Sequence, residues 1–486
     1  MRRDPTVAVV GAGMSGLCVA IALLRNGITD VTLYEKADEV GGTWRENTYP
    51  GLVCDIPSRV YQYTFARNPN WSHLFSPGGE IQDYFRGVAD RFGLRDRIRF
   101  GTEIAHAQFE GGRWRLRTQA GAESTVDFLI CATGVLHHPR LPSIPGLNDF
   151  GGNAFHSARW DHSVELRGRR IAIIGNGSTG VQLVCGLTGV AGRVMLFQRT
   201  PQWVLRLPNP RYSRLTNITH NRFGWLDRLA YRCYSSGYDL FAAGLTKPGL
   251  RRKIMGALCR ASLREVRDPE LRRALTPDYT PMCKRLVMSN GFYRAVQRDD
   301  VDLVTAAIDH VERRGIVTDD GVLHEADVIV LATGFDSHAF FRPMQLIGRD
   351  GIAADDVWRD GPRAYQTVAL PGFPNFFMML GPHSPVGNLA LTTVAESQAD
   401  HILGWIQRWR RGEFDTVEPT LPATDDFNAK LRAAMPDTVW TTGCHSWYLN
   451  KDGVPEVWPF TPAEHRAMLA NPDLGQYDLR RRVAAG

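Results

Sequence analysis

The amino-terminal stretch has the order of elements that a dinucleotide-binding fold requires. The β-favouring residues 7–10 run into a glycine loop at 11–16 (Gly-Ala-Gly-Met-Ser-Gly), and an apolar helical pattern follows over 17–24. A second short strand at 31–34 delivers Glu35, nineteen residues after the last glycine. Since a helix N-terminus attracts phosphates and a carboxylate can bind ribose hydroxyls, this order predicts a nucleotide site.

Each glycine of this loop has its own task. Gly11 permits the tight strand-to-helix turn, Gly13 lets a pyrophosphate approach the backbone, and Gly16 lets the helix pack close to the strand. A glycine triplet alone is a weak signal, because many such turns use glycine only for its conformational freedom. The strand, the helix and Glu35 in register make the dinucleotide interpretation the favoured one.

The same pattern occurs a second time at a constant offset. The strand 170–174 enters a glycine loop at 175–180 (Gly-Asn-Gly-Ser-Thr-Gly), followed by an apolar helix and a strand at 194–197. Arg199 occupies the position of Glu35, and an arginine can hold a 2′-phosphate with two charge-assisted bonds. We therefore expect FAD in the first fold and NADPH in the second, which implies a flavoprotein that takes hydride from NADPH.

Length and composition limit the remaining possibilities. The 486 residues allow about two to four domains, and the net charge of +6 is spread without a dense basic tract, which favours phosphorylated small molecules over nucleic acid. We expect no signal peptide, because the first residues lead directly into the first strand, and no transmembrane segment, because the sequence has no run of about eighteen apolar residues. Eight cysteines, none spaced as C-x-x-C, predict a reduced cytoplasmic protein and argue against a redox-disulfide flavoenzyme.

A glycine- and proline-rich stretch at 41–61 follows the first unit, and its composition predicts a long loop without regular structure. Long loops inside compact domains are usually functional. Trp44 could cover a flat ring, and Asp55 is a carboxylate between apolar neighbours. An ordinary turn or cap is an equally good interpretation of Asp55.

Residues 99–118 alternate apolar and polar and predict an antiparallel hairpin or meander. A buried strand at 128–131 then ends in Ala-Thr-Gly. His137 and His138 precede a proline-rich linker, with no acid or cysteine at metal-binding spacing, so no metal site is predicted.

The segment 150–161 contains the pattern F-x-G-x-x-x-H-x-x-x-W-[PD]. A lone histidine such as His156 is more often structural than catalytic. The pattern, however, resembles the fingerprint of type I Baeyer–Villiger monooxygenases at every fixed position, whereas related flavin-containing and N-hydroxylating monooxygenases have variant forms. In that family the segment links the two domains and organises their movement, so the resemblance assigns His156 and Trp160 a domain-coupling role.

The resemblance covers nearly the whole chain, most closely the group that includes 4-hydroxyacetophenone, cyclohexanone and phenylacetone monooxygenases. Residues 41–44 resemble the flavin-covering loop, and 49–55 the loop with the active-site aspartate. The basic and aromatic segment 205–273 resembles the helical insertion of the NADPH domain. Taken alone, this segment could be a solvated helical subdomain or a helix at a membrane surface.

Lys284 and Arg285 form a basic pair of a kind that is common on surfaces. The family has Lys-Arg in this context, and the resemblance assigns Lys284 to the NADP 2′-phosphate and Arg285 to catalysis. The stretch 443–448 is a further mark of the family. The segment 386–388 lies where substrate-facing side chains vary between members of the family. The shape of the substrate pocket in those members therefore does not predict its shape in this chain.

The predicted fold class is α/β, with two Rossmann-like dinucleotide-binding domains and a helical insertion at about 205–275 in the second. The expected divisions are 1–145 for the first part of the FAD domain, 146–165 for the linker, 166–335 for the NADPH domain, and 336–486 for the return to the FAD domain and the C-terminal segment.

Arg285 and Asp55 are the residues expected to be catalytic, and no residue is expected to bind a metal. The residues expected to bind the cofactors are Gly11, Gly13, Ser15, Gly16, Glu35, Thr43, Trp44, Asp55, Tyr61, Ile104, Gly175, Asn176, Gly177, Ser178, Thr179, Gly180, Gln182, Arg199, Thr200, Lys284 and Arg285.

The resemblance implies an NADPH- and O2-dependent monooxygenase that converts a ketone into an ester or lactone through a flavin C4a-peroxide. An arginine suits the anionic states of this reaction because it stays charged at working pH. One alternative is a flavin monooxygenase that oxidises N or S atoms, and another is a flavin reductase or scaffold without turnover. The identity of the ketone and the choice between monomer and homodimer stay open.

Overall fold

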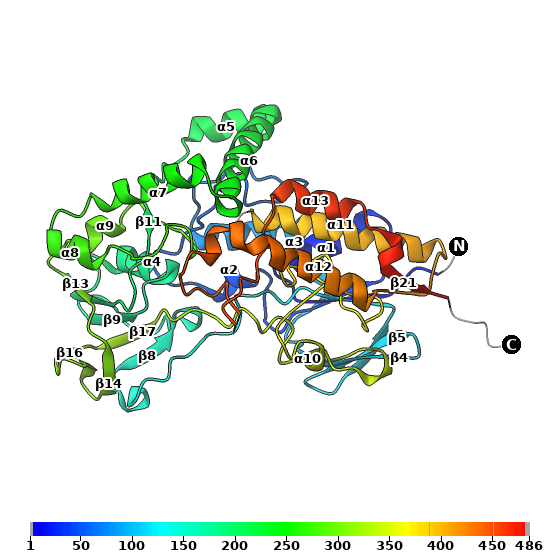
Figure 1. The fold of residues 1–486 in the computed structure, drawn as a ribbon, viewed down its shortest axis with the longest axis horizontal. Helices are drawn as coiled ribbons and strands as arrows, with labels where there is room; N and C mark the ends of the chain where they lie inside the picture. Colours follow the sequence, from blue (N-terminus) through cyan, green and yellow to red (C-terminus); the bar gives the residue numbers. More distant parts are fainter. Residues whose placement is uncertain (1–2, 388, 451, 482–486) are drawn as a thin grey trace.

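Two five-stranded parallel β-sheets organise the chain in the computed structural model, which describes residues 3–387, 389–450 and 452–481 (Figure 1). The first sheet has the order β19-β7-β1-β2-β3 and the second the order β13-β10-β9-β17-β8. The strands of the first sheet are β1 (Val7–Val10), β2 (Val31–Tyr34), β3 (Ile98–Arg99), β7 (Phe128–Cys131) and β19 (Phe376–Met378). Those of the second are β8 (Asn153–His156), β9 (Arg170–Ile174), β10 (Arg193–Phe197), β13 (Val301–Val304) and β17 (Val328–Leu331).

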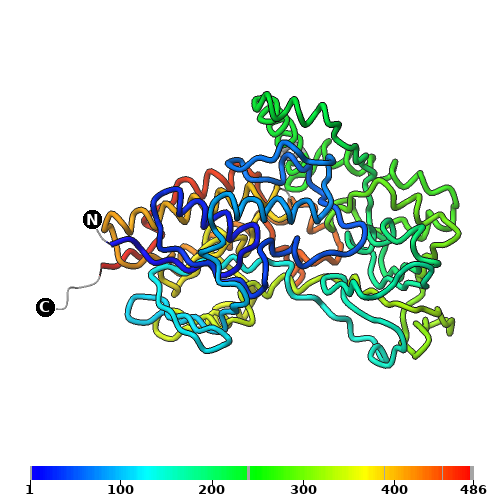
Figure 2. Tube along the Cα trace, turned by 180° about the vertical axis from the view of Figure 1, so that it is seen from behind, coloured from blue at the N-terminus to red at the C-terminus, as the bar shows by residue number. Residues whose placement is uncertain are grey.

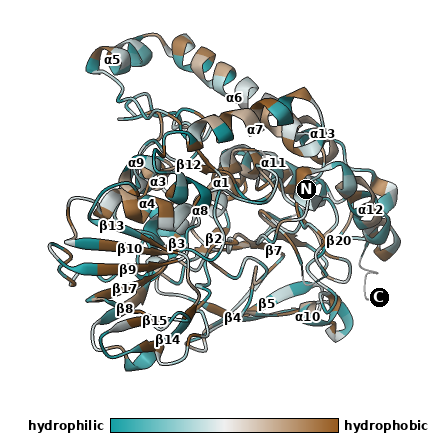
Figure 3. Cartoon of the chain, turned by 60° about the vertical axis from the view of Figure 1, so that its left-hand side comes forward, coloured by the Kyte–Doolittle hydropathy of each residue, from teal (hydrophilic) through white to brown (hydrophobic). Residues whose placement is uncertain are grey.

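The two sheets are built in the same way, as the internal repeat predicts. In the first, β1 leads through helix α1 (Met14–Arg25) to β2, and in the second, β9 leads through α4 (Ser178–Leu187) to β10. The central strands are short apolar runs buried on both faces, which is typical of parallel sheets covered by helices (Figure 3). The α/β fold class is confirmed.

The strand-to-helix turns need glycine for the same reason in both repeats. Gly11 and Gly175 have φ angles of +103° and +107°, and a Cβ on either would lie 2.5 Å from a carbonyl oxygen of the neighbouring strand end. A Cβ at Gly16 or Gly180 would overlap the carbonyl of the first glycine of its own loop. Each turn therefore closes only with glycine at these positions.

Smaller sheets flank the two parallel ones. The expected hairpin within 99–118 is confirmed as β4 and β5 of a four-stranded sheet. The remaining strands are β4 (Ile104–Glu110), β5 (Arg113–Thr118), β6 (Glu123–Val126), β11 (Val204–Leu205), β12 (Val287–Met288), β14 (Ile308–Glu312), β15 (Gly315–Thr318), β16 (Leu323–Glu325), β18 (Gln345–Ile347), β20 (Thr416–Pro419) and β21 (Tyr477–Arg480).

Four helices in the stretch expected to be a helical insertion form an arm at the edge of the molecule (green in Figure 1). They are α5 (Arg214–Arg222), α6 (Gly224–Thr246), α7 (Leu250–Leu263) and α8 (Pro269–Ala274). The other α-helices are α2 (Thr43–Glu46), α3 (Gly78–Arg91), α9 (Phe292–Ala295), α10 (Ala354–Val357), α11 (Leu391–Arg410), α12 (Leu421–Ala434) and α13 (Pro462–Ala470). Among the described residues, no helix is both long and apolar enough to cross a bilayer.

Short 3-10 turns connect several elements. They are Arg95–Arg97, Leu147–Asp149, Ser157–Arg159, Arg349–Gly351, Met435–Asp437, Val439–Thr441 and Leu474–Gln476.

Two segments are more ordered than the sequence indicates. The stretch 41–61, expected to lack regular structure, contains the single-turn helix α2, because the chain turns at Gly42 and four residues without proline follow. In the expected linker, residues 153–156 form β8, an edge strand that pairs with β17 of the second sheet. The linker is therefore anchored to the second fold by main-chain hydrogen bonds.

A buried ion pair attaches the helical arm to the first fold. Nη1 of Arg59 donates to Oδ1 of Asp227 at 2.7 Å, and the two side chains are only 1% and 5% exposed. The guanidinium also lies 4.7 Å from the centre of the Tyr212 ring. Figure 2 shows the loop around Arg59 (blue) beneath the arm (green).

We expect Arg59→Leu to destabilise the protein by about 3 kcal/mol, because it leaves the Asp227 carboxylate buried with a weaker partner, Arg67, at 3.4 Å. The measurement is the midpoint of thermal unfolding. Arg115→Leu is the matched control, since the Arg115–Glu123 pair is exposed on both sides, and it should leave the midpoint almost unchanged. An equal shift in both variants would contradict this account.

Candidate active site

Arg285 and Asp55 form a hydrogen-bonded ion pair between segments 230 residues apart. Nε and Nη2 of Arg285 donate to Oδ2 of Asp55 at 3.1 and 2.7 Å, and Nη1 donates to the Val386 carbonyl at 3.0 Å. Both side chains are half-buried, so solvent screens the pair less than it would on an open surface. Asp55 thus fixes the plane of the guanidinium, while catalysis by either residue stays a prediction.

Tyr448 is a polar neighbour of Arg285 that sequence reasoning missed. Both residues line the same pocket, so the hydroxyl lies within reach of the charge of Arg285. Burial raises the pKa of this hydroxyl, and the positive charge of Arg285 opposes the rise. The motif at 443–448 is visible in the sequence, but no spacing rule links it to an arginine so far away. Of the segment 386–388, Gly387 packs near this hydroxyl, and Asn388 lies outside the described residues.

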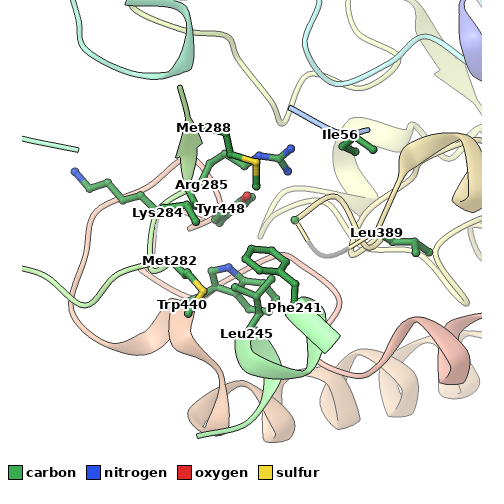
Figure 4. Close-up of a pocket in the computed structure, with 12 residues that line it drawn as sticks. Ile56, Phe241, Leu245, Met282, Lys284, Arg285, Met288, Leu389, Trp440 and Tyr448 are labelled. Carbon is green, nitrogen blue, oxygen red and sulfur yellow. The ribbon is translucent and has the colours of Figure 1, made fainter. Parts of the chain in front are cut away.

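Arg285 lies on the wall of a small pocket of about 20 Å3 (Figure 4). The rest of the wall is largely apolar: Ile56 comes from the loop that carries Asp55, Phe241 from α6, and Trp440 from the C-terminal segment. Four segments distant in the sequence therefore meet around one guanidinium. A fixed charge beside apolar groups acts on a bound molecule with little screening.

A disulfide bond joins two of these segments. Cys283 and Cys444 are bonded across 161 residues, with Cα atoms 6.0 Å apart. The expectation that all cysteines are reduced is wrong for this pair, which the spacing of the cysteines in the sequence could not reveal. The bond connects the segment of Arg285 to the segment of Tyr448, so it fixes the two close together.

Lys284 also lines the pocket, but its side chain extends in the direction opposite to that of Arg285 (Figure 4). Burial lowers the pKa of Lys284, and the nearby positive charge of Arg199 lowers it further. The ammonium lies 4.8 Å from the centre of the Tyr279 ring. Two cations that approach each other beside the second glycine loop favour a phosphate between them. Lys284 and Arg199 are therefore brought together as the prediction of a 2′-phosphate site requires.

Glu35 is tied to the first glycine loop. One carboxylate oxygen accepts from the Ala12 N–H at 2.8 Å and the other from the Ala37 N–H at 2.9 Å. Since each oxygen has two lone pairs, the carboxylate can also accept from a ribose hydroxyl, which stays a prediction. A cleft of about 900 Å3 opens beside it, with Lys36 and Trp160 in its lining, and its size fits the adenosine part of a dinucleotide.

The predicted flavin-covering loop lies against the first glycine loop, because Gly41 N–H donates to the Ala12 carbonyl at 3.1 Å. Trp44 donates from Nε1 to the Tyr61 hydroxyl at 3.1 Å, and the two rings meet edge to face. Thr43 begins α2, and Ser15 is buried in α1. Ile104 is also buried, next to Glu103, which lines the cleft of about 900 Å3.

The second glycine loop leaves space for a pyrophosphate. No atom lies within 4 Å of the position that a Cβ on Gly177 would take, and Ser178 and Thr179 open the helix α4 there. The Asn176 side chain donates to the Thr200 carbonyl at 2.8 Å and so fixes the loop to the end of β10. Direct contacts of these residues with a cofactor stay predictions.

The two folds touch where the loop 49–55 meets α4. The Gln182 amide accepts from the Tyr49 hydroxyl and donates to the Val53 carbonyl, both at 2.8 Å. These bonds make Gln182 hold the Asp55 loop, and its predicted contact with a cofactor stays a prediction. Gly51 and Gly186 approach backbone to backbone, and a Cβ on Gly186 would lie 2.6 Å from Gly51 N.

His156 connects the fingerprint segment to the end of the second sheet. Its Nε2 donates to the Gly334 carbonyl at 3.0 Å, and its Nδ1 accepts from the Ala158 N–H at 3.1 Å. Burial lowers the pKa of the ring, which keeps it neutral and suits both bonds. His156 thus has the contacts of a structural histidine, and they lie at the junction between linker and second fold.

Nowhere in the described ranges do three or more His, Cys, Asp or Glu side chains form a group that could hold a metal ion.

Comparisons with known proteins agree with this geometry. The model of the flavin-binding monooxygenase-like family matches residues 4–345. The chain is similar to an uncharacterized monooxygenase of Mycobacterium tuberculosis, with 74% identity over 99% of this chain and 97% of the relative. It is also similar to a Baeyer–Villiger monooxygenase of Streptomyces coelicolor, with 37% identity over 99% of this chain and 93% of the relative.

A solved structure shares the whole architecture. The crystal structure of OTEMO in complex with FAD and NADP has a TM-score of 0.87 at 28% identity, over 98% of this chain and 99% of that chain. The similarity extends over both parallel sheets and the helical arm, since nearly the whole chain is covered.

We expect Gly186→Ala to lower the midpoint of thermal unfolding, because the new methyl group would press on the backbone at Pro50 and Gly51. Overpacking of this kind costs about 1–3 kcal/mol. Gly404→Ala in α11 is the control, since no atom lies within 4 Å of its Cβ position, and its midpoint should stay or rise slightly. A Gly186 variant as stable as the wild type would show that the two folds do not depend on this approach.

Proposed function

Because the chain belongs to the flavin-binding monooxygenase-like family, we propose that it is a Baeyer–Villiger monooxygenase that inserts one oxygen atom of O2 beside a ketone carbonyl. The observation that carries the proposal is Arg285, which lies on the wall of a largely apolar pocket and is paired with Asp55 from the other dinucleotide-binding fold. The product would be an ester, or a lactone where the ketone is cyclic.

FAD and NADPH are the cofactors of this monooxygenase, as in the related OTEMO complex with FAD and NADP. When bound, the flavin would supply the chemistry of accepting a hydride from NADPH and of reacting with O2. The first glycine loop, Glu35 and the adenosine cleft fit FAD. The second loop fits the pyrophosphate of NADPH, and Arg199 with Lys284 would hold its 2′-phosphate.

Arg285 would supply a fixed positive charge where negative charge develops on oxygen during the attack on the carbonyl. A guanidinium does not lose its proton at working pH, so it stabilises an oxyanion without protonating the attacking oxygen. Asp55 and the Val386 carbonyl occupy three of its N–H groups and so fix its orientation. Asp55 would act as a positioning residue in this scheme.

Tyr448 would assist from the C-terminal segment, beside Arg285 (Figure 4). Burial keeps its hydroxyl protonated, and the charge of Arg285 acts on it. We propose that it helps to hold the guanidinium, together with the Cys283–Cys444 bond that joins the two segments. The apolar side chains around them would exclude water from the reacting atoms.

The fingerprint segment would couple the two folds during turnover. His156 bonds to the Gly334 carbonyl at the end of β17, and Trp160 lines the adenosine cleft of the first fold. A shift of the second sheet would thus reach the cleft through this short segment. We therefore assign His156 and Trp160 a coupling role rather than a chemical one.

Replacing Arg199 by Ala should raise the KM for NADPH about ten- to a hundredfold, because a hydrogen bond to a charged group is lost. The KM for NADH, which lacks the 2′-phosphate, should change little. Arg193→Ala is the matched control at the other end of β10, where the arginine pairs with Asp302 on the surface. An unaltered preference between NADPH and NADH would remove Arg199 from the cofactor site.

Replacing Arg285 by Ala should abolish ketone oxygenation while NADPH is still consumed, with the electrons appearing as hydrogen peroxide. A single oriented donor at an oxyanion is worth about two to three orders of magnitude in rate. The measurement combines the rate of flavin reduction in stopped flow with the product yield from a panel of ketones and sulfides. Asp55→Ala should show the same defect more mildly.

Lys284→Ala is the control for this experiment, because Lys284 is adjacent in sequence but its side chain extends in the opposite direction, toward the charge of Arg199. It should raise the KM for NADPH and leave the yield of product per NADPH unchanged. Near wild-type ester yield from Arg285→Ala would overturn the mechanism. If sulfides or amines are oxidised and no ester forms, the result would favour the alternative function, a flavin monooxygenase that oxidises N or S atoms.

A further inference from the structure

Helix α5 and the first part of α6 form a helical tip, residues 214–232, that projects from the body of the molecule (Figures 1 and 3). Five large apolar side chains of this tip are between 45% and 69% exposed: Leu215, Ile218, Phe223, Trp225 and Leu229. A soluble surface normally shows such side chains singly, and a group of this size marks an interaction site.

The exposed apolar residues share one face of each helix with arginines. On α6, Trp225 and Leu229 are four residues apart, and Arg228 and Arg232 fall on the same face. On α5, Leu215 and Ile218 share a face with Arg222 in the same way. The opposite face of α6 contains the buried Asp227 and turns toward the body.

The charge around the tip has one sign. Residues 205–264 contain twelve Lys and Arg but only two Asp and no Glu. One of the acids, Asp227, is buried against Arg59 and does not offset the charge of the surface. The tip is therefore apolar and cationic at once.

We propose that the helical tip docks on the surface of an anionic lipid bilayer without crossing it. Trp, Phe and Leu at a helix surface partition into the boundary between head groups and acyl chains, and the flanking arginines bind lipid phosphates. A second copy of the chain fits less well, because a symmetric contact would bring the same positive face against itself.

The position of the tip lets docking and catalysis be measured separately. Phe241 and Leu245 at the inner end of α6 line the pocket, and Trp225 is sixteen residues from Phe241. At 1.5 Å per residue the tip lies about 24 Å along the helix from the pocket. Substitutions at the tip therefore leave the pocket wall intact.

The test is cosedimentation of the FAD-loaded protein with vesicles. Phosphatidylcholine vesicles with about one third phosphatidylglycerol should bind it, and pure phosphatidylcholine vesicles should bind it more weakly. Added salt should weaken the binding to the anionic vesicles. The double variant Trp225→Ser/Leu229→Ser and the double variant Arg228→Gln/Arg232→Gln should each reduce the affinity at least about tenfold.

The matched control is Leu141→Ser/Val322→Ser, which removes two exposed apolar side chains elsewhere on the surface and should keep full binding. Thermal midpoint and flavin content verify that each variant is folded. Failure of the wild type to bind anionic vesicles, or equal loss in the control, would overturn the proposal. The proposal would also fail if the wild type bound no vesicles but formed a dimer in sedimentation velocity, and if Trp225→Ser/Leu229→Ser abolished that dimer. The face would then contact a second copy of the chain. None of these readouts requires turnover, so they stand apart from the proposed reaction.

Discussion

The arrangement of the site depends on one guanidinium, that of Arg285, which is bound by segments from different parts of the chain. Arg285 is held by Asp55 from the first fold and by the Val386 carbonyl, and Tyr448 from the C-terminal segment lines the same pocket. The segments of Asp55 and Tyr448 are each fixed by a further contact. Gln182 holds the Asp55 loop from α4, and the disulfide of Cys283 joins the Arg285 segment to that of Tyr448. The direction of one charge is thus determined by contacts spread over most of the chain.

The helical arm serves both the interior and the surface of the molecule. Its inner end contributes Phe241 and Leu245 to the pocket, and its outer end carries apolar and basic side chains into solvent. The buried Arg59–Asp227 pair fixes the arm between these two regions. Because removing one partner of a buried pair is costly, the arm is held in one orientation relative to the first fold.

Much of the fold could be predicted because the decisive signals are local. A strand, a glycine loop and a helix follow one another within about twenty residues, and Gly11 and Gly175 are required by the backbone conformation of a turn that closes on itself. The difference between Glu35 in the first repeat and Arg199 at the matching position of the second is also visible from the local sequence. Trp160 and His156 were found through a motif of contiguous residues. The single helical turn α2 was missed because it is too short to show a period.

Neighbouring residues are enough to predict the two dinucleotide-binding folds, their order and the difference in charge between Glu35 and Arg199, since each of these signals is local. The packing of distant segments, in contrast, brings Tyr448 to the pocket of Arg285, joins Cys283 to Cys444 and places Gln182 against the other fold. Nor does helical spacing alone say which apolar residues of the arm stay exposed. These contacts and exposures depend on which surfaces, distant in sequence, pack together, and a run of consecutive residues does not contain that information.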